Sequence, residues 1–261
     1  MLIRQHIVDA RLHWSFGRGH LVVLGDVFDR GAHHTEILWL LYQLEAEARG
    51  AGGGVDFVLG NHEVMELGGD LRYLNPRYRD TAKSLGVESY AQLFGDNSVL
   101  GQWLRTRATV IKVNGLLCLH GGVSPELLAS QLSLKDINDA VRSALSEALP
   151  EDAAMRERRA LLLGENGPLW YRGYFPAESG GATATAEDVT RIRQFYAVDR
   201  ILVGHTRVPT ITPLYGGAVI AVQVYPRREE SGQVSFEALL VRDGVLYRAR
   251  PDGGTEKLPA N

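Results

Sequence analysis

Short apolar runs rich in β-branched residues recur along the chain, and four of them end in small or polar residues. These runs are Leu21 to Leu24, Val55 to Leu59, Leu116 to Leu119 and Ile201 to Val203. A continuous apolar run of this length is typical of a strand that is buried on both faces. Each run therefore predicts a strand inside a sheet.

Apolar residues at helical spacing lie between or after these runs. The pattern predicts helices over Glu36 to Arg49, Pro125 to Leu149 and Ala186 to Tyr196. It also predicts a helix near the first residue of the sequence, from the spacing of Ile3, Ile7, Val8 and Leu12. Because strands and helices alternate in much of the chain, we expect an α/β fold.

The pattern changes after Val208 to shorter or alternating apolar runs. They occupy Ala218 to Tyr225, Val234 to Val241 and Val245 to Arg248, and the turn-forming pairs Ser231-Gly232 and Asp243-Gly244 interrupt them. We therefore expect a single domain over residues 1–261. Residues 1–208 would form its α/β part, and residues 209–261 would form an antiparallel β tail of the same domain.

Composition narrows the classes of function. The chain has 261 residues, of which 45% are hydrophobic, so it can bury a substantial core. A net charge of −3 provides no basic surface for nucleic acid, and no apolar stretch is long enough to span a membrane. The single cysteine, Cys118, cannot form an intramolecular disulfide, which fits a reducing, cytoplasmic setting. The oligomeric state stays open.

Residues that commonly bind metals follow directly after the four predicted strands: Asp26, Asn61 with His62, His120 and His205. In an open α/β sheet, the carboxyl ends of the strands line the ligand crevice. Oxygen and imidazole ligands without thiolate suit divalent manganese, iron or zinc. Two such ions can hold both the attacking and the leaving oxygen of a phosphoryl transfer, so the pattern favours hydrolysis of a phosphate ester.

These residues also carry a family resemblance. Residues 25–31 (GDVFDRG), 60–63 (GNHE), 120–122 (HGG) and 204–206 (GHT) resemble successive motifs of the calcineurin-like metallophosphoesterase superfamily, in its phosphoprotein phosphatase branch. Residues 66–73 (ELGGDLRY) and 168–174 (PLWYRGY) are similar to bacterial Shewanella-like protein phosphatases. The resemblance implies a layered αββα sandwich of mixed sheets and two divalent metal ions.

The resemblance assigns metal ligation to Asp26, Asn61, His120 and His205, with Asp26 bridging the two ions through its two carboxylate oxygens. It makes His62 the general acid that protonates the leaving group, oriented by Asp29. Arg30 would hold a phosphate oxygen through its forked donors, and Arg172 is a second candidate for that contact. The nucleophile would be a metal-bound water or hydroxide.

Five neighbouring residues receive no catalytic role. His33 and His34 match no ligand position of the superfamily, and we expect them to be ordinary loop or helix-start residues. Glu63 is expected to be structural. Trp170 and Tyr171 would either shape the pocket or belong to the core.

One motif of the superfamily is absent from the sequence. Members normally begin with a strand that ends in Asp-x-His, which supplies two ligands of the first metal, but no aspartate here is followed two positions later by a histidine. Either the coding sequence continues upstream by on the order of 20–40 residues that contain this strand, or the chain is a reduced, inactive relative. In both cases we expect the fold to lack its first strand and residues 1–261 to hold at most one metal firmly.

Three functions remain from the sequence. The first is a metal-dependent phosphatase acting on phosphoproteins or small phosphate esters, which the presence of His62, Asp29 and Arg30 favours. The second is a pseudophosphatase that binds a phosphorylated partner without turnover, which the missing ligands favour. The third is a hydrolase of dinucleoside polyphosphates or cyclic phosphodiesters, as in other branches of the superfamily.

Overall fold

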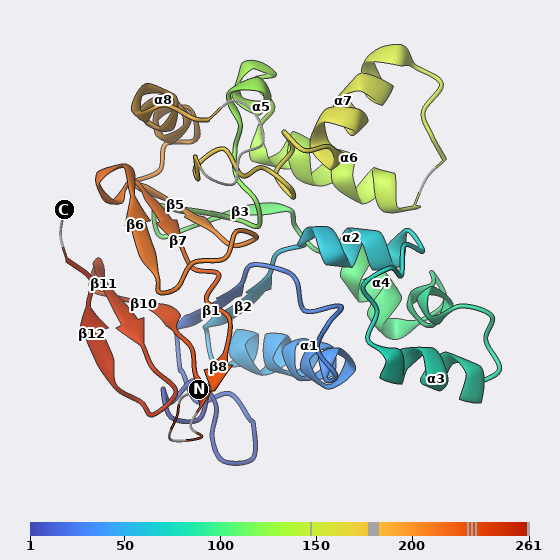
Figure 1. Ribbon diagram of the computed structural model, residues 1–261, viewed down its shortest axis with the longest axis horizontal. Coiled ribbons are helices and arrows are strands. Elements are labelled where there is room, and N and C mark those ends of the chain that lie inside the picture. The colour runs from blue at the N-terminus through green and yellow to red at the C-terminus, as the bar shows by residue number, and fades with distance from the viewer. Residues whose placement is uncertain (147, 177–182, 229, 231, 233, 260–261) are drawn as a thin grey trace.

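The computed structural model describes residues 1–146, 148–176, 183–228, 230, 232 and 234–259. A five-stranded mixed sheet lies near the middle of the molecule (Figure 1). Its strands are β3 (Val110–Val113), β4 (Leu116–Leu119), β5 (Arg200–Val203), β6 (Thr212–Leu214) and β7 (Val219–Ala221), in the order β3-β4-β5-β7-β6. The three central strands are parallel, and the edge strands β3 and β6 are antiparallel to their neighbours.

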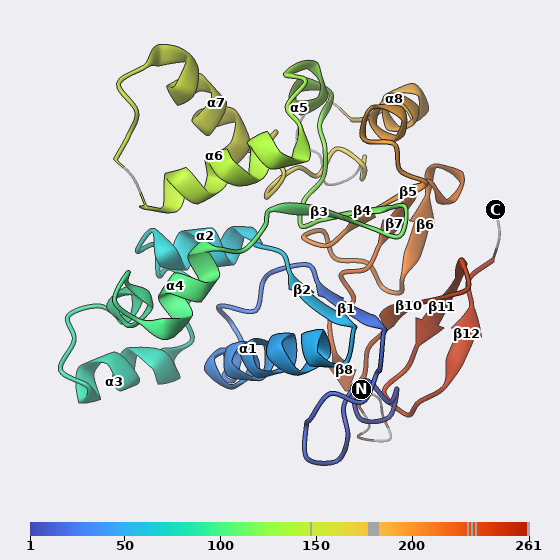
Figure 2. The same cartoon turned by 180° about the vertical axis from the view of Figure 1, so that it is seen from behind.

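A second layer of strands packs beneath this sheet. It contains the parallel pair β1 (His20–Val23) and β2 (Gly54–Phe57), and beside β1 the antiparallel strands β10 (Ala238–Arg242), β11 (Val245–Ala249) and β12 (Thr255–Lys257) (Figures 1 and 2). A short hairpin joins β8 (Arg227–Arg228) to β9 (Val234–Ser235).

Helices cover both outer faces. On the side of the five-stranded sheet lie α5 (Pro125–Ala129), α6 (Leu134–Ser146), α7 (Ala153–Leu163) and α8 (Ala186–Tyr196). On the side of β1 and β2 lie α1 (His34–Gly50), α3 (Pro76–Ser84), α4 (Val99–Arg105) and the 3₁₀ helix η1 (Tyr90–Phe94). The short helix α2 (Asn61–Leu67) follows β2 directly, and a second 3₁₀ turn, η2 (Tyr215–Gly217), precedes β7. No helix among the described residues has both the length and the apolar character needed to cross a bilayer.

Strand β4 shows how the layers are held together. Its side chains alternate between the two faces of the sheet, as the pleat requires. Leu117 and Leu119 pack in the cluster that contains residues of α5, α6 and α8, whereas Leu116 and Cys118 pack in a second cluster with Val22 of β1. A third cluster lies between β2 and helices α1, α3 and α4. Three apolar interfaces between four layers confirm the expected αββα sandwich.

Three sequence expectations about individual elements were wrong. Residues 1–14 form turns and not a helix, because the Asp9 carboxylate accepts hydrogen bonds from the amides of Arg11 and His13, at 2.8 and 2.9 Å, and stabilises a local turn. The helix expected over residues 125–149 is interrupted at Gln131, whose φ is 51°, and residue 147 lies outside the described residues. Strand β7 pairs antiparallel with β6 but parallel with β5, so the tail is not antiparallel throughout.

Candidate metal centre and active site

The predicted site residues meet where four strands end. Asp26 lies in the loop after β1, Asn61 and His62 open α2 after β2, His120 follows β4 and His205 follows β5. All are buried except Asp26, which is half-buried. Because β4 and β5 are adjacent and parallel, as are β1 and β2, the ends of each pair bring their polar residues together.

His120 lies at the centre of a group of four residues, Asp26, Asn61, His120 and His205, which we call the ligand cluster. Its Nδ1 donates a hydrogen bond to the Leu24 carbonyl, so the neutral imidazole keeps a lone pair on Nε2. That Nε2 lies 3.0 Å from Asn61 Oδ1, 3.2 Å from Asp26 Oδ1 and 3.2 Å from His205 Nδ1. Four atoms that can donate electron pairs therefore point at one small volume.

This arrangement fits one divalent cation. Ligand atoms of Asp26, His120 and His205 all lie within 4.8 Å of one another, the only such group of three histidine, cysteine or acidic residues found within the described part of the chain. Nε2 of His205 is buried without a hydrogen-bond partner. A carboxylate, an amide oxygen and two imidazoles without thiolate form a ligand set suited to manganese, iron or zinc.

The ionisation states of these groups are coupled. Burial opposes a charge on Asp26, but His120 and His62 outweigh it and lower the pKa of this carboxyl to about 2. Burial also opposes a charge on His120, yet the Asp26 carboxylate raises the pKa of His120 above its ordinary value. Burial, assisted by His120 and Arg172, lowers the pKa of His205 to about 3. His205 is therefore neutral near pH 7, which is the form that binds metals.

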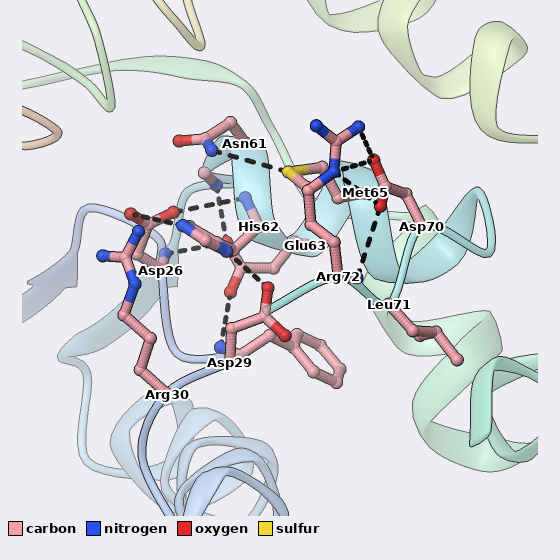
Figure 3. A network of polar contacts seen from close by, with 12 residues as sticks. Asp26, Asp29, Arg30, Asn61, His62, Glu63, Met65, Asp70, Leu71 and Arg72 are labelled. Carbon is pink, nitrogen blue, oxygen red and sulfur yellow. Dashed lines mark hydrogen bonds and ion pairs between the residues drawn. The ribbon is translucent and has the colours of Figure 1, made fainter. Parts of the chain in front are cut away.

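His62 and Asp29 form a buried pair beside the ligand cluster. Nδ1 of His62 hydrogen-bonds to Asp29 Oδ2, and the two side chains point toward each other in Figure 3. The opposite ring nitrogen, Nε2, lies 4.0 Å from Asp26 Oδ2 and so faces the candidate metal centre. The hydrogen bond to Asp29 fixes which nitrogen of the imidazole points into the site.

Glu63 holds the loop that carries Asp26. Its carboxylate accepts hydrogen bonds from the amides of Gly60 and Asp26, at 2.7 and 2.8 Å, and from those of Val27 and Phe28, at 2.8 and 3.1 Å. It is fully buried and lies on the helix α2 that also carries His62. These contacts agree with the structural role expected from the sequence.

The backbone at the site is strained. Asp26, Asp29, Arg30 and His205 have φ angles of 57°, 67°, 50° and 59°, in the left-handed region that non-glycine residues rarely adopt. Such conformations persist where the surrounding structure determines them, and they gather at functional sites. Close approach also requires glycine: a Cβ on Gly60 would lie 2.5 Å from Asp26 Oδ1.

The two arginines named from the sequence occupy different settings. Arg30 is exposed, and its Nη1 donates to the Tyr225 hydroxyl at 2.7 Å while its guanidinium lies 5.2 Å from the centre of the Tyr73 ring. Arg172 is half-buried, and its Nη1 donates to Thr206 Oγ1 at 3.2 Å, next to the candidate ligand His205.

A family model for calcineurin-like phosphoesterases matches residues 9–209, which include every residue of this site except Tyr225. The chain belongs to the calcineurin-like phosphoesterase family. Its fold and the order of its motifs agree with that membership.

Two named relatives of this phosphoesterase are protein phosphatases. It is 27% identical over 218 residues to Shewanella-like protein phosphatase 1 of Plasmodium berghei, covering 80% of this chain and 58% of that protein. It is 35% identical over 100 residues to Shewanella-like protein phosphatase 2 of Arabidopsis thaliana, covering 38% of this chain and 23% of that protein. The chain thus spans less than two thirds of these curated relatives.

A solved structure is similar over nearly the whole chain. The cold-active protein-tyrosine phosphatase of a psychrophilic Shewanella species is 39% identical, with a TM-score of 0.86 over 99% of this chain and 75% of that one.

Sequence reasoning gave no individual role to three residues around the site of this phosphoesterase, although two of them, Glu66 and Tyr73, belong to the motif at residues 66–73. Tyr73 and Tyr225 flank Arg30, and the Tyr73 ring also lies 5.3 Å from the His62 ring. Glu66 is fully buried, and neither of its carboxylate oxygens has a hydrogen-bond partner. Its position three residues after Glu63, on the same helical face, was a usable signal for Glu66. No pattern in the sequence connects Tyr225 to Arg30, 195 positions away.

The remaining residues singled out from the sequence have ordinary roles. His33 is exposed beside Glu36, and His34 is buried against the Tyr78 ring at 3.7 Å between ring centres. Tyr171 belongs to the core, whereas the Trp170 ring meets His205 edge to face at 5.6 Å. Of the two aromatic candidates, only Trp170 contacts a predicted ligand.

Proposed function

We propose that this chain hydrolyses phosphate monoesters on phosphoproteins, with a divalent cation held by Asp26, Asn61, His120 and His205. The observation that carries this proposal is the buried His62–Asp29 pair directly beside the converging ligand atoms. A site that only bound a phosphorylated partner would not require an imidazole oriented in this way. The protein phosphatases among its relatives support the choice of substrate class.

A cation bound here would supply Lewis-acid chemistry, because it lowers the pKa of water and offsets negative charge on phosphoryl oxygens. The chain's own residues do the rest. Burial keeps His205 neutral, and the Leu24 carbonyl keeps the lone pair of neutral His120 directed into the site. His205 is therefore held in the neutral form that a cation requires, and His120 is held in the required orientation.

His62 is proposed as the general acid. The hydrogen bond from Nδ1 to Asp29 leaves Nε2 facing the site, where it can give a proton to the leaving alkoxide or phenoxide oxygen. The Asp29 carboxylate then stabilises the orientation of the ring through the transfer. Asp29 has a φ of 67°, a conformation that persists only where the surrounding structure determines it.

Arg30 is proposed to contact a phosphoryl oxygen. No carboxylate among the described residues forms an ion pair with it, and the Tyr225 hydroxyl engages only Nη1. The other N–H groups of its guanidinium are free for a bidentate contact with phosphate. Arg172 is proposed as a second contact, since its hydrogen bond to Thr206 fixes it beside His205.

The test is His62→Asn, assayed with added manganese on phosphotyrosine and phosphoserine peptides and on an aryl phosphate. We expect kcat to fall by about 10²–10⁴-fold while metal content is unchanged, because a general acid acts only in the transition state. The loss should be smaller for the aryl phosphate, whose leaving group needs less protonation. His33→Asn, at an exposed position, is the control.

Equal losses on aryl and alkyl substrates would remove the general-acid role from His62. Unmodified protein that binds the metal but turns over none of these substrates would instead favour the pseudophosphatase alternative.

A further inference from the structure

Two buried carboxyl groups on helix α2 have opposite surroundings. Glu63 and Glu66 are both fully buried. The Glu63 carboxylate accepts hydrogen bonds from four backbone N–H groups, and such bonds stabilise a negative charge. Neither oxygen of Glu66 has a hydrogen-bond partner. Because a buried charge without partners is strongly unfavourable, burial favours the protonated acid at Glu66.

Glu66 lies close to the pair formed by His62 and Asp29. It follows His62 by four residues on α2, so the two side chains project from the same face of the helix, with Cβ atoms about 5–6 Å apart. Asp29 approaches this helix, since its Oδ2 hydrogen-bonds to His62 Nδ1. Its other oxygen, Oδ1, points away from the ring in Figure 3 and is buried without a partner.

The two acids interact through their charges. Burial, then the Asp29 carboxylate and then Glu63 raise the pKa of Glu66 to about 8. Among the described residues, Tyr90 of η1 also interacts with Glu66, and its hydroxyl is neutral near pH 7. Two carboxylates that lie together in a buried setting are strongly disfavoured when both are ionised, so one proton serves the pair.

The hydrogen bonds indicate which acid holds that proton. Asp29 accepts a hydrogen bond from His62, which stabilises its charged form, whereas Glu66 accepts none. The proton is therefore more stable on Glu66. A protonated carboxyl group has one O–H to donate, and Asp29 Oδ1 is a buried acceptor that lacks a donor.

We propose that Glu66 is a positioning residue for the His62–Asp29 pair: it holds a proton and shares it in a hydrogen bond with Asp29 Oδ1, directly or through one buried water. The inference rests on the proposed function, since it concerns the proposed general acid. The bond fixes the plane of the Asp29 carboxylate beside His62. It also lowers the basicity of Asp29, so that the proton on Nδ1 stays on the imidazole.

His34 is the competing donor to Asp29. Burial lowers the pKa of His34 to about 4 against the opposing effect of Asp29, so the ring is neutral near pH 7 and carries one N–H. Its Nδ1 is buried without a partner, and its Nε2 lies 2.7 Å from the Tyr90 hydroxyl. Variants of Glu66 and Asp29 separate the two donors.

Infrared difference spectroscopy detects the proton without substrate. The spectrum of the unaltered chain minus that of Glu66→Gln should contain the C=O stretching band of a protonated carboxyl group, and this band should disappear as the pH rises through about 8. In an Asp29→Asn background the band should shift to higher frequency, because an amide accepts a weaker hydrogen bond than a carboxylate. Glu88→Gln, at an exposed position, should leave the band unchanged.

Two variants of Glu66 form a matched pair for kinetics. Glu66→Gln keeps an N–H donor, whereas Glu66→Met has a similar size and no donor. We expect kcat to stay within about threefold of the unaltered value in Glu66→Gln, and to fall about tenfold or more in Glu66→Met, at unchanged KM and metal content. As the pH rises through about 8, kcat of the unaltered chain should fall more steeply than that of Glu66→Gln.

The absence of a carboxylic-acid band would overturn the proposal, and so would a band that Asp29→Asn leaves in place, which would favour His34 as the donor. Equal kcat for folded Glu66→Gln and Glu66→Met would also overturn it, since Glu66 would then only fill space. If the unaltered protein turns over no substrate, the proposed function fails, and the infrared bands still decide the role of Glu66. The same spectra decide if Glu66→Met does not fold.

Discussion

Strands β4 and β1 resemble each other in sequence but differ in their surroundings. Each has four described residues and is mostly apolar, and each is followed by a residue of the candidate metal centre, His120 after β4 and Asp26 after β1. All four residues of β4 are buried between β3 and β5, whereas none of those in β1 is fully buried. The difference lies in the number of paired edges, since β1 has one partner strand and β4 has two.

The two strands consequently hold their site residues by different means. His120 is positioned by a complete sheet and by its hydrogen bond to the Leu24 carbonyl. The backbone at Asp26 is positioned by the Glu63 carboxylate, which accepts hydrogen bonds from the amides of the loop after β1. The residue after the well-packed strand is thus held by the sheet, whereas the loop after the half-covered strand is held largely by the Glu63 carboxylate.

Of the changes considered below, loss of the Glu63 hydrogen bonds should therefore have the largest effect on stability and on metal content. An amide oxygen and an NH₂ group cannot accept the four N–H bonds that the carboxylate accepts, so Glu63→Gln leaves buried donors unpaired. We expect a loss of about 3–5 kcal/mol in unfolding free energy, from about 1–3 kcal/mol for each unpaired group, together with a lower metal content. Chemical denaturation and metal analysis measure both quantities. The exposed change Glu157→Gln should alter neither, and a Glu63→Gln protein with full stability and metal content would contradict this account.

Truncating apolar side chains compares the two strands themselves. Leu117 on β4 is fully buried, so Leu117→Ala should cost about 2–5 kcal/mol through lost transfer energy and a cavity. Val22 on β1 is half-buried, so Val22→Ala should cost about 1 kcal/mol or less, because little apolar area is removed from water on folding. Denaturation midpoints of the two variants give the difference. Equal losses would show that β1 is as well packed as β4.

Glu66 provides a smaller, pH-dependent effect. Burial, with Asp29 and Glu63 nearby, raises the pKa of this carboxyl from 4.5 to about 8. The folded protein thus holds a proton that the unfolded chain has released, so stability falls as the pH rises from about 4.5 to about 8. Glu66→Gln should remove this dependence and stabilise the protein at pH 8 by on the order of 1–3 kcal/mol.

Denaturation at several pH values, with Glu88→Gln as an exposed control, measures the effect of Glu66. If Glu66→Gln shows the same slope of stability against pH as the unaltered chain, Glu66 is not the group responsible.

The sequence predicted the parts of the molecule in which local pattern and tertiary structure agree. The apolar runs before Asp26, Asn61, His120 and His205 are strands, and the four residues meet as expected. Short helices such as α2 and α4, each of seven residues, went unpredicted because two turns carry too little periodicity.

Two other features depend on contacts that the sequence does not display. A turn forms at Asp9 in place of the helix that the apolar spacing predicts, because the Asp9 carboxylate accepts hydrogen bonds from the amides of Arg11 and His13. The hydrogen bond from Arg30 to Tyr225 joins distant segments and appears only when the chain is folded. Long-range polar contacts of this kind leave no periodic signal along the chain.

The hydrogen bond between His120 and the Leu24 carbonyl would make the proposed metal centre release a proton when it binds a cation. Nδ1 is already occupied as a donor, so any additional proton on His120 must sit on Nε2, the atom that a cation would also claim. Asp26 raises the pKa of His120, so a proton competes more strongly with a cation for Nε2. Cation binding at the proposed centre would then release a proton and become tighter as the pH rises. The pH below which activity is lost would then be the pH at which the site loses its cation. A higher cation concentration would move that pH lower.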